Sequence, residues 1–270
     1  MSDPKPTTRA ITLEALLPAT PEEAVRFLSD PAELAKWFAP YVDGSVGEVL
    51  TFRWPPEMQW QEWVEVARSG RLVRWGDPPT DPRQGGSPGG MVIEWTLTSE
   101  PGGTRLRMVH SGFGEGESWD DQYDATLAGW RFFLWHLVEV LRQHRAETRT
   151  VAWERRKSTL SREALGTKLF GSQGLAFEPE RPRAGSVAHL RLGDSRLAFE
   201  VQHVQWPTHI WGRLPGLNGA LLLVEMEPGR TGAFSTGFWL STYGLDQNRL
   251  GEIQACLHAL ADAVFGPAAG

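Results

Sequence analysis

The sequence predicts an α+β protein made of two tandem units, each with several antiparallel strands followed by a long helix. Three observations lead to this prediction. The chain has 270 residues, of which 41% are hydrophobic, and this suits two domains of ordinary size, each with its own core. A strand pattern at 104–111 continues into a helical pattern that extends to about His144. A shorter version of the same succession occupies 234–265.

The strand and the long helix of the first unit each have one apolar face. Leu106, Met108 and His110 recur with a period of two, which places their side chains on one face of a strand. Trp130 and Phe133 begin a set of apolar residues that recurs at helical spacing. We therefore expect the two faces to share one interior.

Three helix starts carry capping signals. Thr20 is a suitable N-cap, and Glu23 completes a capping box. Asp30 and Glu33 form the same pattern of N-cap and capping-box residue, which predicts a second short helix. Ser118 and Asp121 form a third capping box, which predicts the start of the long helix.

The remaining elements follow from the same periodicities. In the first unit we predict strands at 46–54, 60–68, 70–75, 91–98 and 104–111. In the second we predict a helix at 161–170, strands at 186–192, 195–204, 209–214, 220–226 and 234–243, and a closing helix at about 246–265. The charge-rich segment 145–157 is predicted to link a first domain, 10–144, to a second domain, 158–266.

The two units read as internal repeats. Residues 90–103 align with 217–230, and each stretch has the sequence Glu-Pro-Gly at the same aligned position. Residues 111–114 then fall on 241–244, and a long helix follows in both cases. Few positions are identical, so the shared order of elements is the stronger part of the comparison.

Three stretches of the first unit resemble a known family. They are D-P-A-E-L-A-K-W-F-A-P from Asp30 to Pro40, G-T-R-L-R-M-V-H-S-G-F-G from Gly103 to Gly114, and G-W-R-F-F-L-W-H-L from Gly129 to Leu137. Together they resemble the activator of heat-shock-protein-90 ATPase homologue family, within the START/Bet v 1-like (SRPBCC) superfamily, over about residues 10–143. The resemblance implies a helix-grip fold, in which a curved antiparallel sheet wraps around a long C-terminal helix. The second unit is assigned to the same superfamily through the internal repeat.

In a helix-grip fold a cavity commonly opens between sheet and helix, and an aromatic-lined cavity is the default small-molecule site. We therefore predict that the first unit binds an apolar or aromatic small molecule. The candidate ligand-binding residues are Trp37, Trp95, Met108, His110, Phe113, Trp119, Tyr123, Trp130 and Phe133. The competing interpretation is core packing, because large aromatic residues are the usual material of a core. His110 either orients a ligand or hydrogen-bonds locally to a carbonyl or to Tyr123.

The repeat alignment suggests that the two units differ in function. It places Leu222 where the first unit has Trp95, and Leu240 where the first unit has His110. Both replacements favour a closed apolar core. We therefore expect the ligand site in the first unit and a structural or interaction role for the second.

Several classes of function are disfavoured. The net charge of −6 argues against nucleic acid as a partner. The single cysteine, Cys256, excludes an internal disulfide and a thiolate zinc site, and it fits a reducing compartment. The chain has no apolar run long enough for a membrane span and no signal-peptide pattern, so we expect a cytoplasmic protein. No motif indicates a catalytic residue set, a cofactor or a metal.

Three functional hypotheses remain, and fold alone cannot choose among them. The first is a binding module for a small molecule. The second, implied by the family's name, is a co-chaperone-like or stress-related module with a chaperone as protein partner, although we expect no docking segment before residue 10. The third is an aromatase/cyclase-like enzyme of the wider superfamily, for which only His110 and Tyr123 offer acid–base groups. Binding is the leading hypothesis, and we do not expect an enzyme.

Overall fold

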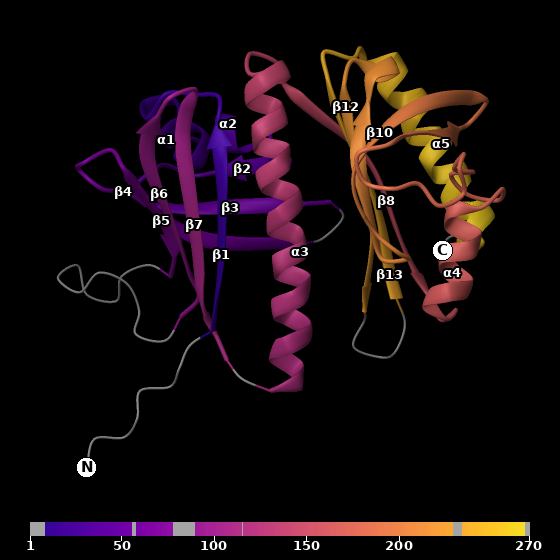
Figure 1. Cartoon of the computed structure of the whole chain (residues 1–270), viewed down its shortest axis with the longest axis horizontal. Coiled ribbons are helices and arrows are strands. Elements are labelled where there is room, and N and C mark those ends of the chain that lie inside the picture. The colour runs from indigo at the N-terminus through magenta and orange to yellow at the C-terminus, as the bar shows by residue number, and fades with distance from the viewer. Residues whose placement is uncertain (1–8, 56–57, 78–89, 115, 229–233, 268–270) are drawn as a thin grey trace. The chain divides into compact units, whose positions relative to one another are not determined.

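The computed structural model describes residues 9–55, 58–77, 90–114, 116–228 and 234–267. The chain divides into two compact units, 1–146 and 147–270, called unit 1 and unit 2 below. Each unit holds one antiparallel sheet and ends in a long helix (Figure 1). The predicted α+β class with two tandem helix-grip units is confirmed.

The predicted elements of unit 1 occur in the predicted order, and β2 is a further strand that was not predicted. They are β1 (Arg9–Leu17), α1 (Pro21–Ser29), α2 (Pro31–Leu34), β2 (Tyr41–Asp43), β3 (Val49–Trp54), β4 (Met58–Val66), β5 (Leu72–Gly76), β6 (Val92–Glu100), β7 (Gly103–Phe113) and α3 (Glu117–Glu139), which ends in a π-helical turn, η1 (Val140–His144). The described strands lie in the order β1-β7-β6-β5-β4-β3-β2. The first strand of the unit thus pairs with the last.

Unit 2 repeats this topology with one strand fewer among the described residues. Its elements are β8 (Arg149–Ser158), α4 (Arg162–Phe170), β9 (Val187–Leu192), β10 (Ser195–Gln205), β11 (His209–Leu214), the 3-10 turn η2 (Pro215–Leu217), β12 (Ala220–Pro228), β13 (Phe234–Tyr243) and α5 (Gln247–Phe265). The strands lie in the order β8-β13-β12-β11-β10-β9. Here too the first strand lies beside the last, and the others follow in reverse chain order.

The segment 145–157 was predicted as a linker, and this prediction is wrong. Residues 149–158 form β8, which pairs along its whole length with β13. The many charged residues of this segment obscured its alternation of inward and outward side chains. Ala152, on the inward face, is fully buried. Glu154 and Arg156, on the same face as Ala152, form an ion pair with each other. Charges that are paired in this way are compatible with a half-buried strand, so the fold of unit 2 begins before residue 158.

The predicted helix starts are correct at α1 but not at α3. The Oγ1 of Thr20 accepts a hydrogen bond from the backbone N–H of Glu23 at 3.2 Å. The carboxylate of Glu23 forms an ion pair with Arg145 (2.9 Å) instead of closing a capping box. The N-cap of α3 is Gly116, with a φ of 104° that suits glycine. Ser118 therefore lies inside the helix and is not its N-cap residue.

The hairpin register corrects the repeat alignment by two residues. Trp95 lies opposite Met108 across β6 and β7, whereas Leu222 lies opposite Leu240 across β12 and β13. If Leu222 is the counterpart of Trp95, the counterpart of Leu240 is therefore Met108 and not His110. The shift arises because the turn between β6 and β7 is shorter than the connection between β12 and β13. A shift of two residues keeps every side chain on its original face.

Two tryptophans hydrogen-bond to the end of α1, Trp75 from β5 of the sheet and Trp37 from the segment that follows α2. The indole Nε1–H of Trp37 donates to the carbonyl of Phe27 at 2.8 Å, and that of Trp75 donates to the carbonyl of Leu28 at 2.9 Å. These carbonyls lie in the last turn of α1, where no partner is available within a helix. Each bond thus satisfies a buried indole and a helix end together.

We predict that Ala152→Asp destabilises the full chain by about 3 kcal/mol or more, because it places an unpaired carboxylate in the core of unit 2. Lys157→Asp is the matched control, since Lys157 is exposed on the same strand and its replacement should change the free energy of unfolding by less than about 1 kcal/mol. Urea denaturation measures both. Equal, small effects would indicate a linker and contradict the assignment of β8.

Candidate functional site

The interior of unit 1 is built from aromatic rings contributed by the sheet and by α3. Trp75 and Trp95 are fully buried on β5 and β6, and their ring centroids lie 5.2 Å apart. Trp130 of α3 meets Trp95 edge-on at 5.3 Å. Phe38, which follows α2, stacks parallel to Trp130 at 5.5 Å. The period of two in β6 and the helical spacing in α3 thus bring Trp95 and Trp130 together as the sequence predicts, and Trp75 and Phe38 join them.

This ring cluster continues to the surface of unit 1. Phe38 contacts Trp54 of β3 edge-to-face at 5.1 Å, and Trp54 stacks on Trp60 of β4 at 4.4 Å. Trp60 is 36% exposed. Phe133 of α3 lies 4.7 Å from Phe38 and is half-buried. A continuous chain of ring contacts therefore links the partly exposed Trp60 to the buried Trp95.

The structure places the nine predicted site residues in two adjoining groups. Six lie in the ring cluster or directly beside it: Trp37, Trp95, Met108, His110, Trp130 and Phe133. The other three, Phe113, Trp119 and Tyr123, lie at the end of β7 and the start of α3. The ring of Phe113 is 5.3 Å from that of Tyr123 and 4.8 Å from that of His110, so it connects the two groups. Trp119 packs over Gly114, where an added Cβ would lie 2.5 Å from its Nε1.

His110 is held as a neutral side chain. Its Nδ1 accepts a hydrogen bond from the Nε1–H of Trp130 at 2.9 Å, so the proton of the neutral ring is on Nε2. Burial lowers the pKa of His110 to about 4. The expected local partner was a carbonyl or Tyr123, but Tyr123 donates its hydroxyl to the carbonyl of Ala10 instead (3.3 Å). Near neutral pH His110 therefore carries no charge, and its Nε2 bears the proton of the ring.

Trp95 differs from the other tryptophans at the centre of the ring cluster. The indoles of Trp37, Trp75 and Trp130 each donate a hydrogen bond. The Nε1–H of Trp95 is buried and finds no acceptor among the described residues. Leaving such a donor unsatisfied costs about 1 to 3 kcal/mol, so its presence in a native interior calls for an explanation.

Glu62 is a candidate that the sequence analysis did not single out. It lies on β4 directly opposite the buried Leu50 of β3, so its carboxyl is on the inward face of the sheet. Burial, and secondarily the charge of Asp77, raise the pKa of Glu62 to about 7. The sequence contained a signal for this position. Glu62 stands between Trp60 and Val64 in the period-two pattern of the strand, so all three side chains lie on the same face.

Residues 18–142 match the model of the family described as Activator of Hsp90 ATPase homolog 1-like protein. Unit 1 is similar to this family over most of its length. The match covers the elements from α1 to the turn after α3 and does not extend into unit 2. The chain has no match among the curated proteins.

Solved structures similar to this chain include proteins of one unit and of two. The solution structure of the Aha1 dimer from Colwellia psychrerythraea is 23% identical, covers 49% of this chain and 96% of that one, and has a TM-score of 0.41. A protein from Mesorhizobium loti is 25% identical over 50% of this chain and 97% of that one, with a TM-score of 0.41. The di-domain ARO/CYC BexL from the BE-7585A biosynthetic pathway is 15% identical over 96% of both chains, with a TM-score of 0.41.

Membrane-spanning helices and metal-binding clusters are both absent from the residues that the structure describes. None of the helices among them is long and apolar enough to cross a membrane. Within the same residues, no three His, Cys, Asp or Glu side chains are grouped so that they could hold a metal ion. The cytoplasmic location stays a prediction.

We predict that Trp95→Ala lowers the free energy of unfolding by about 3 to 5 kcal/mol, because the side chain is fully buried among rings. Phe133→Ala should cost clearly less, since Phe133 is half-buried at the accessible part of the ring cluster. Urea denaturation compares the two. A cost below about 1 kcal/mol for Trp95→Ala would contradict the packing of Trp95 in the core.

We predict that His110 weakens the fold in acid. Its pKa is about 4 in the folded chain and 6.5 in its ordinary state, so protons bind preferentially to the unfolded chain, and stability falls as the pH decreases from 6.5 to 4. The loss due to His110 should be about 2 to 3 kcal/mol between pH 7 and pH 4. His110→Leu removes this part of the loss, while His209, whose pKa is also lowered to about 4 by burial, stays in both proteins. An unchanged pH dependence in the variant would contradict the prediction.

Proposed function

We propose that unit 1 binds an apolar or aromatic small molecule that carries a hydrogen-bond acceptor, in the interior between its sheet and α3. The observation that carries this proposal is the buried indole Nε1–H of Trp95, which has no acceptor among the described residues. A carbonyl or ether oxygen of a ligand would satisfy this donor, so binding recovers free energy that the unliganded fold lacks.

The surroundings of Trp95 support a planar, uncharged ligand. The rings between Trp60 and Trp95 make stacked and edge-on contacts with one another, and a planar ligand would make contacts of the same kinds. His110 supplies a second donor through its Nε2–H, because its Nδ1 is occupied by Trp130. Two donors within an apolar lining are typical of a site that orients a small ligand by few polar contacts.

Acid–base catalysis on the same ligand is a second candidate function, and Glu62 favours it. A carboxyl group with a pKa of about 7 can both donate and accept a proton near neutral pH. Such a group is what an aromatase/cyclase-like enzyme requires and what His110, with its lowered pKa, does not supply. Under this alternative the purified protein would convert the retained molecule, and Glu62→Gln would retain binding but lose conversion.

We predict that Trp95→Phe separates ligand binding from stability. The change keeps an aromatic ring and removes a donor that has no acceptor, so stability should change by about 1 kcal/mol or less. Trp75→Phe is the matched control: it leaves the carbonyl of Leu28 without its donor and should therefore cost more stability. The probes are prodan, a naphthalene that carries a ketone, and 2-dimethylaminonaphthalene, which lacks it.

Fluorescence titration should show that Trp95→Phe loses about tenfold in affinity for prodan and little for the ketone-free analogue. Native mass spectrometry of the full chain purified from its own cells should show a retained small molecule with an oxygen or nitrogen acceptor. Unchanged affinity of Trp95→Phe for both probes would overturn the proposal. Stimulation of a chaperone ATPase by the ligand-free chain would favour the protein-interaction hypothesis instead.

A further inference from the structure

A hollow of about 620 Å³ lies in unit 2, within that unit alone. Its lining comes from the end of β8 with the residues that follow it (157–160), from Lys168 of α4, and from the last turn of α5 with its cap (262–266). Sites for small molecules have volumes of about 300 to 1,000 Å³. The hollow is therefore large enough for a ligand, and its side chains indicate which kind.

Part of the lining of the hollow is apolar. Leu160, Val264 and Phe265 contribute to its lining and are called the apolar wall. Leu160 is 37% exposed, although it belongs to no helix or strand that would require it there. The Oγ of Ser158 accepts a hydrogen bond from the backbone N–H of Leu160 at 3.2 Å, which stabilises the turn that carries Leu160. The hollow thus keeps apolar surface in contact with water.

Two cations lie in the lining of the same hollow. Lys157 at the end of β8 and Lys168 on α4 line it from different elements, and they are called the lysine pair. Both side chains are exposed. Among the residues that the structure describes, none forms an ion pair with either lysine. An anion entering the hollow therefore meets two positive charges that are not engaged elsewhere.

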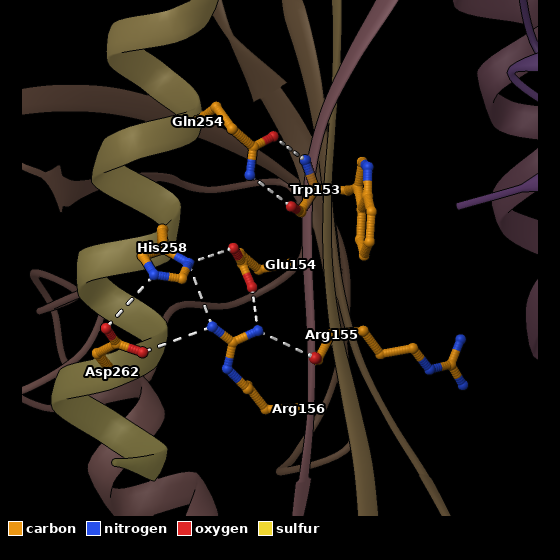
Figure 2. A network of polar contacts seen from close by, with 7 residues as sticks. All are labelled: Trp153, Glu154, Arg155, Arg156, Gln254, His258 and Asp262. Carbon is orange, nitrogen blue, oxygen red and sulfur yellow. Dashed lines mark hydrogen bonds and ion pairs between the residues drawn. The ribbon is translucent and has the colours of Figure 1, made fainter. Parts of the chain in front are cut away.

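The one acidic residue of the lining, Asp262, is directed to partners outside it (Figure 2). Its carboxylate lies 3.5 Å from the guanidinium of Arg156 and 3.5 Å from the Nε2 of His258. Arg156 and His258 also contact Glu154, whose side chain is 9% exposed. These contacts hold Asp262 against β8, so it does not pair with the lysine pair. Its remaining charge nevertheless favours a singly charged anion over a doubly charged phosphate.

We propose that this hollow binds an unbranched apolar molecule with one carboxylate, such as a free fatty acid. The carboxylate lies between the two ammonium groups of the lysine pair, where charge-assisted hydrogen bonds are strong, and the chain covers the apolar wall. The hydroxyl of Thr159, which also lines the hollow, is a further donor. This ligand differs from that of unit 1, which carries an uncharged acceptor, so the site adds a second binding function to the chain.

The test is calorimetric titration of the full chain with dodecanoate and with dodecan-1-ol, both below the concentration at which they aggregate. We expect dodecanoate to bind and the alcohol to bind at least about tenfold more weakly. Lys157→Gln/Lys168→Gln should lose about tenfold or more in affinity for dodecanoate without a change in melting temperature, because both lysines are exposed. High salt should weaken the binding of dodecanoate.

Three further variants test whether dodecanoate binds in this hollow and not elsewhere on the chain. Arg181→Gln removes an exposed cation of unit 2 that does not line the hollow and should leave dodecanoate binding unchanged. Leu160→Asp should abolish it without lowering the melting temperature, since Leu160 is exposed. Trp95→Phe, which tests the site of unit 1, should have no effect on dodecanoate.

The proposal is overturned if the double lysine variant binds dodecanoate as the unchanged chain does, or if the alcohol binds equally well. It is also overturned if dodecanoate fails to bind while vesicles of phosphatidylcholine with phosphatidic acid bind in a lysine-dependent manner, because the lysine pair would then serve a membrane surface. Loss of dodecanoate binding in Trp95→Phe alone would place the fatty acid in unit 1.

Discussion

Each tryptophan buried in unit 1 carries an N–H group into an apolar interior, and the need to satisfy these groups organises the unit. Trp37 and Trp75 donate to the last carbonyls of α1, and Trp130 of α3 donates to His110 of β7. Trp75 thus connects the sheet to α1, Trp37 connects the segment after α2 to α1, and Trp130 connects α3 to the sheet, while ring contacts fill the space between these elements. Trp63 of β4 and Trp95 are left without an acceptor among the described residues, and the proposed ligand site follows from Trp95 because it lies at the centre of the ring cluster.

In both units the first strand is an edge strand, and the long helix engages it. The side-chain amide of Gln254 on α5 accepts from the backbone N–H of Trp153 at 3.0 Å and donates to its carbonyl at 2.7 Å (Figure 2). In unit 1 the hydroxyl of Tyr123 on α3 donates to the carbonyl of Ala10 on β1. Such contacts occupy backbone groups that would otherwise be open to pairing with another chain. The helix therefore completes the edge of its own sheet as well as covering its face.

The sequence predicts the order of the elements and most strand positions because periodicity is a local property. The strand prediction at 234–243 agrees with β13, and that at 209–214 agrees with β11. The error at 145–157 arose because charged residues were taken as a sign of solvent, whereas Glu154 and Arg156 pair on the inward face of β8. Hydrogen-bond partners such as Trp130 for His110 depend on how α3 packs on the sheet, and a single sequence does not contain that distance. The sequence pattern shows that Glu62 shares a face of its strand with Trp60 and Val64. Its raised pKa, however, depends on burial and on the charge of Asp77, which follows the neighbouring strand β5.

The indole bonds to α1 also determine how unit 1 opens. A surface helix of nine residues would ordinarily fray and re-form on its own, since its contacts with the rest of a domain are few. The end of α1 cannot separate in this way, because the carbonyls of Phe27 and Leu28 are held by rings that lie in the centre of the core. Releasing them would expose Trp37 and Trp75 to water at the same time. The local stability of α1 is thereby raised toward that of the whole unit, and the helix and the sheet unfold as a single cooperative element.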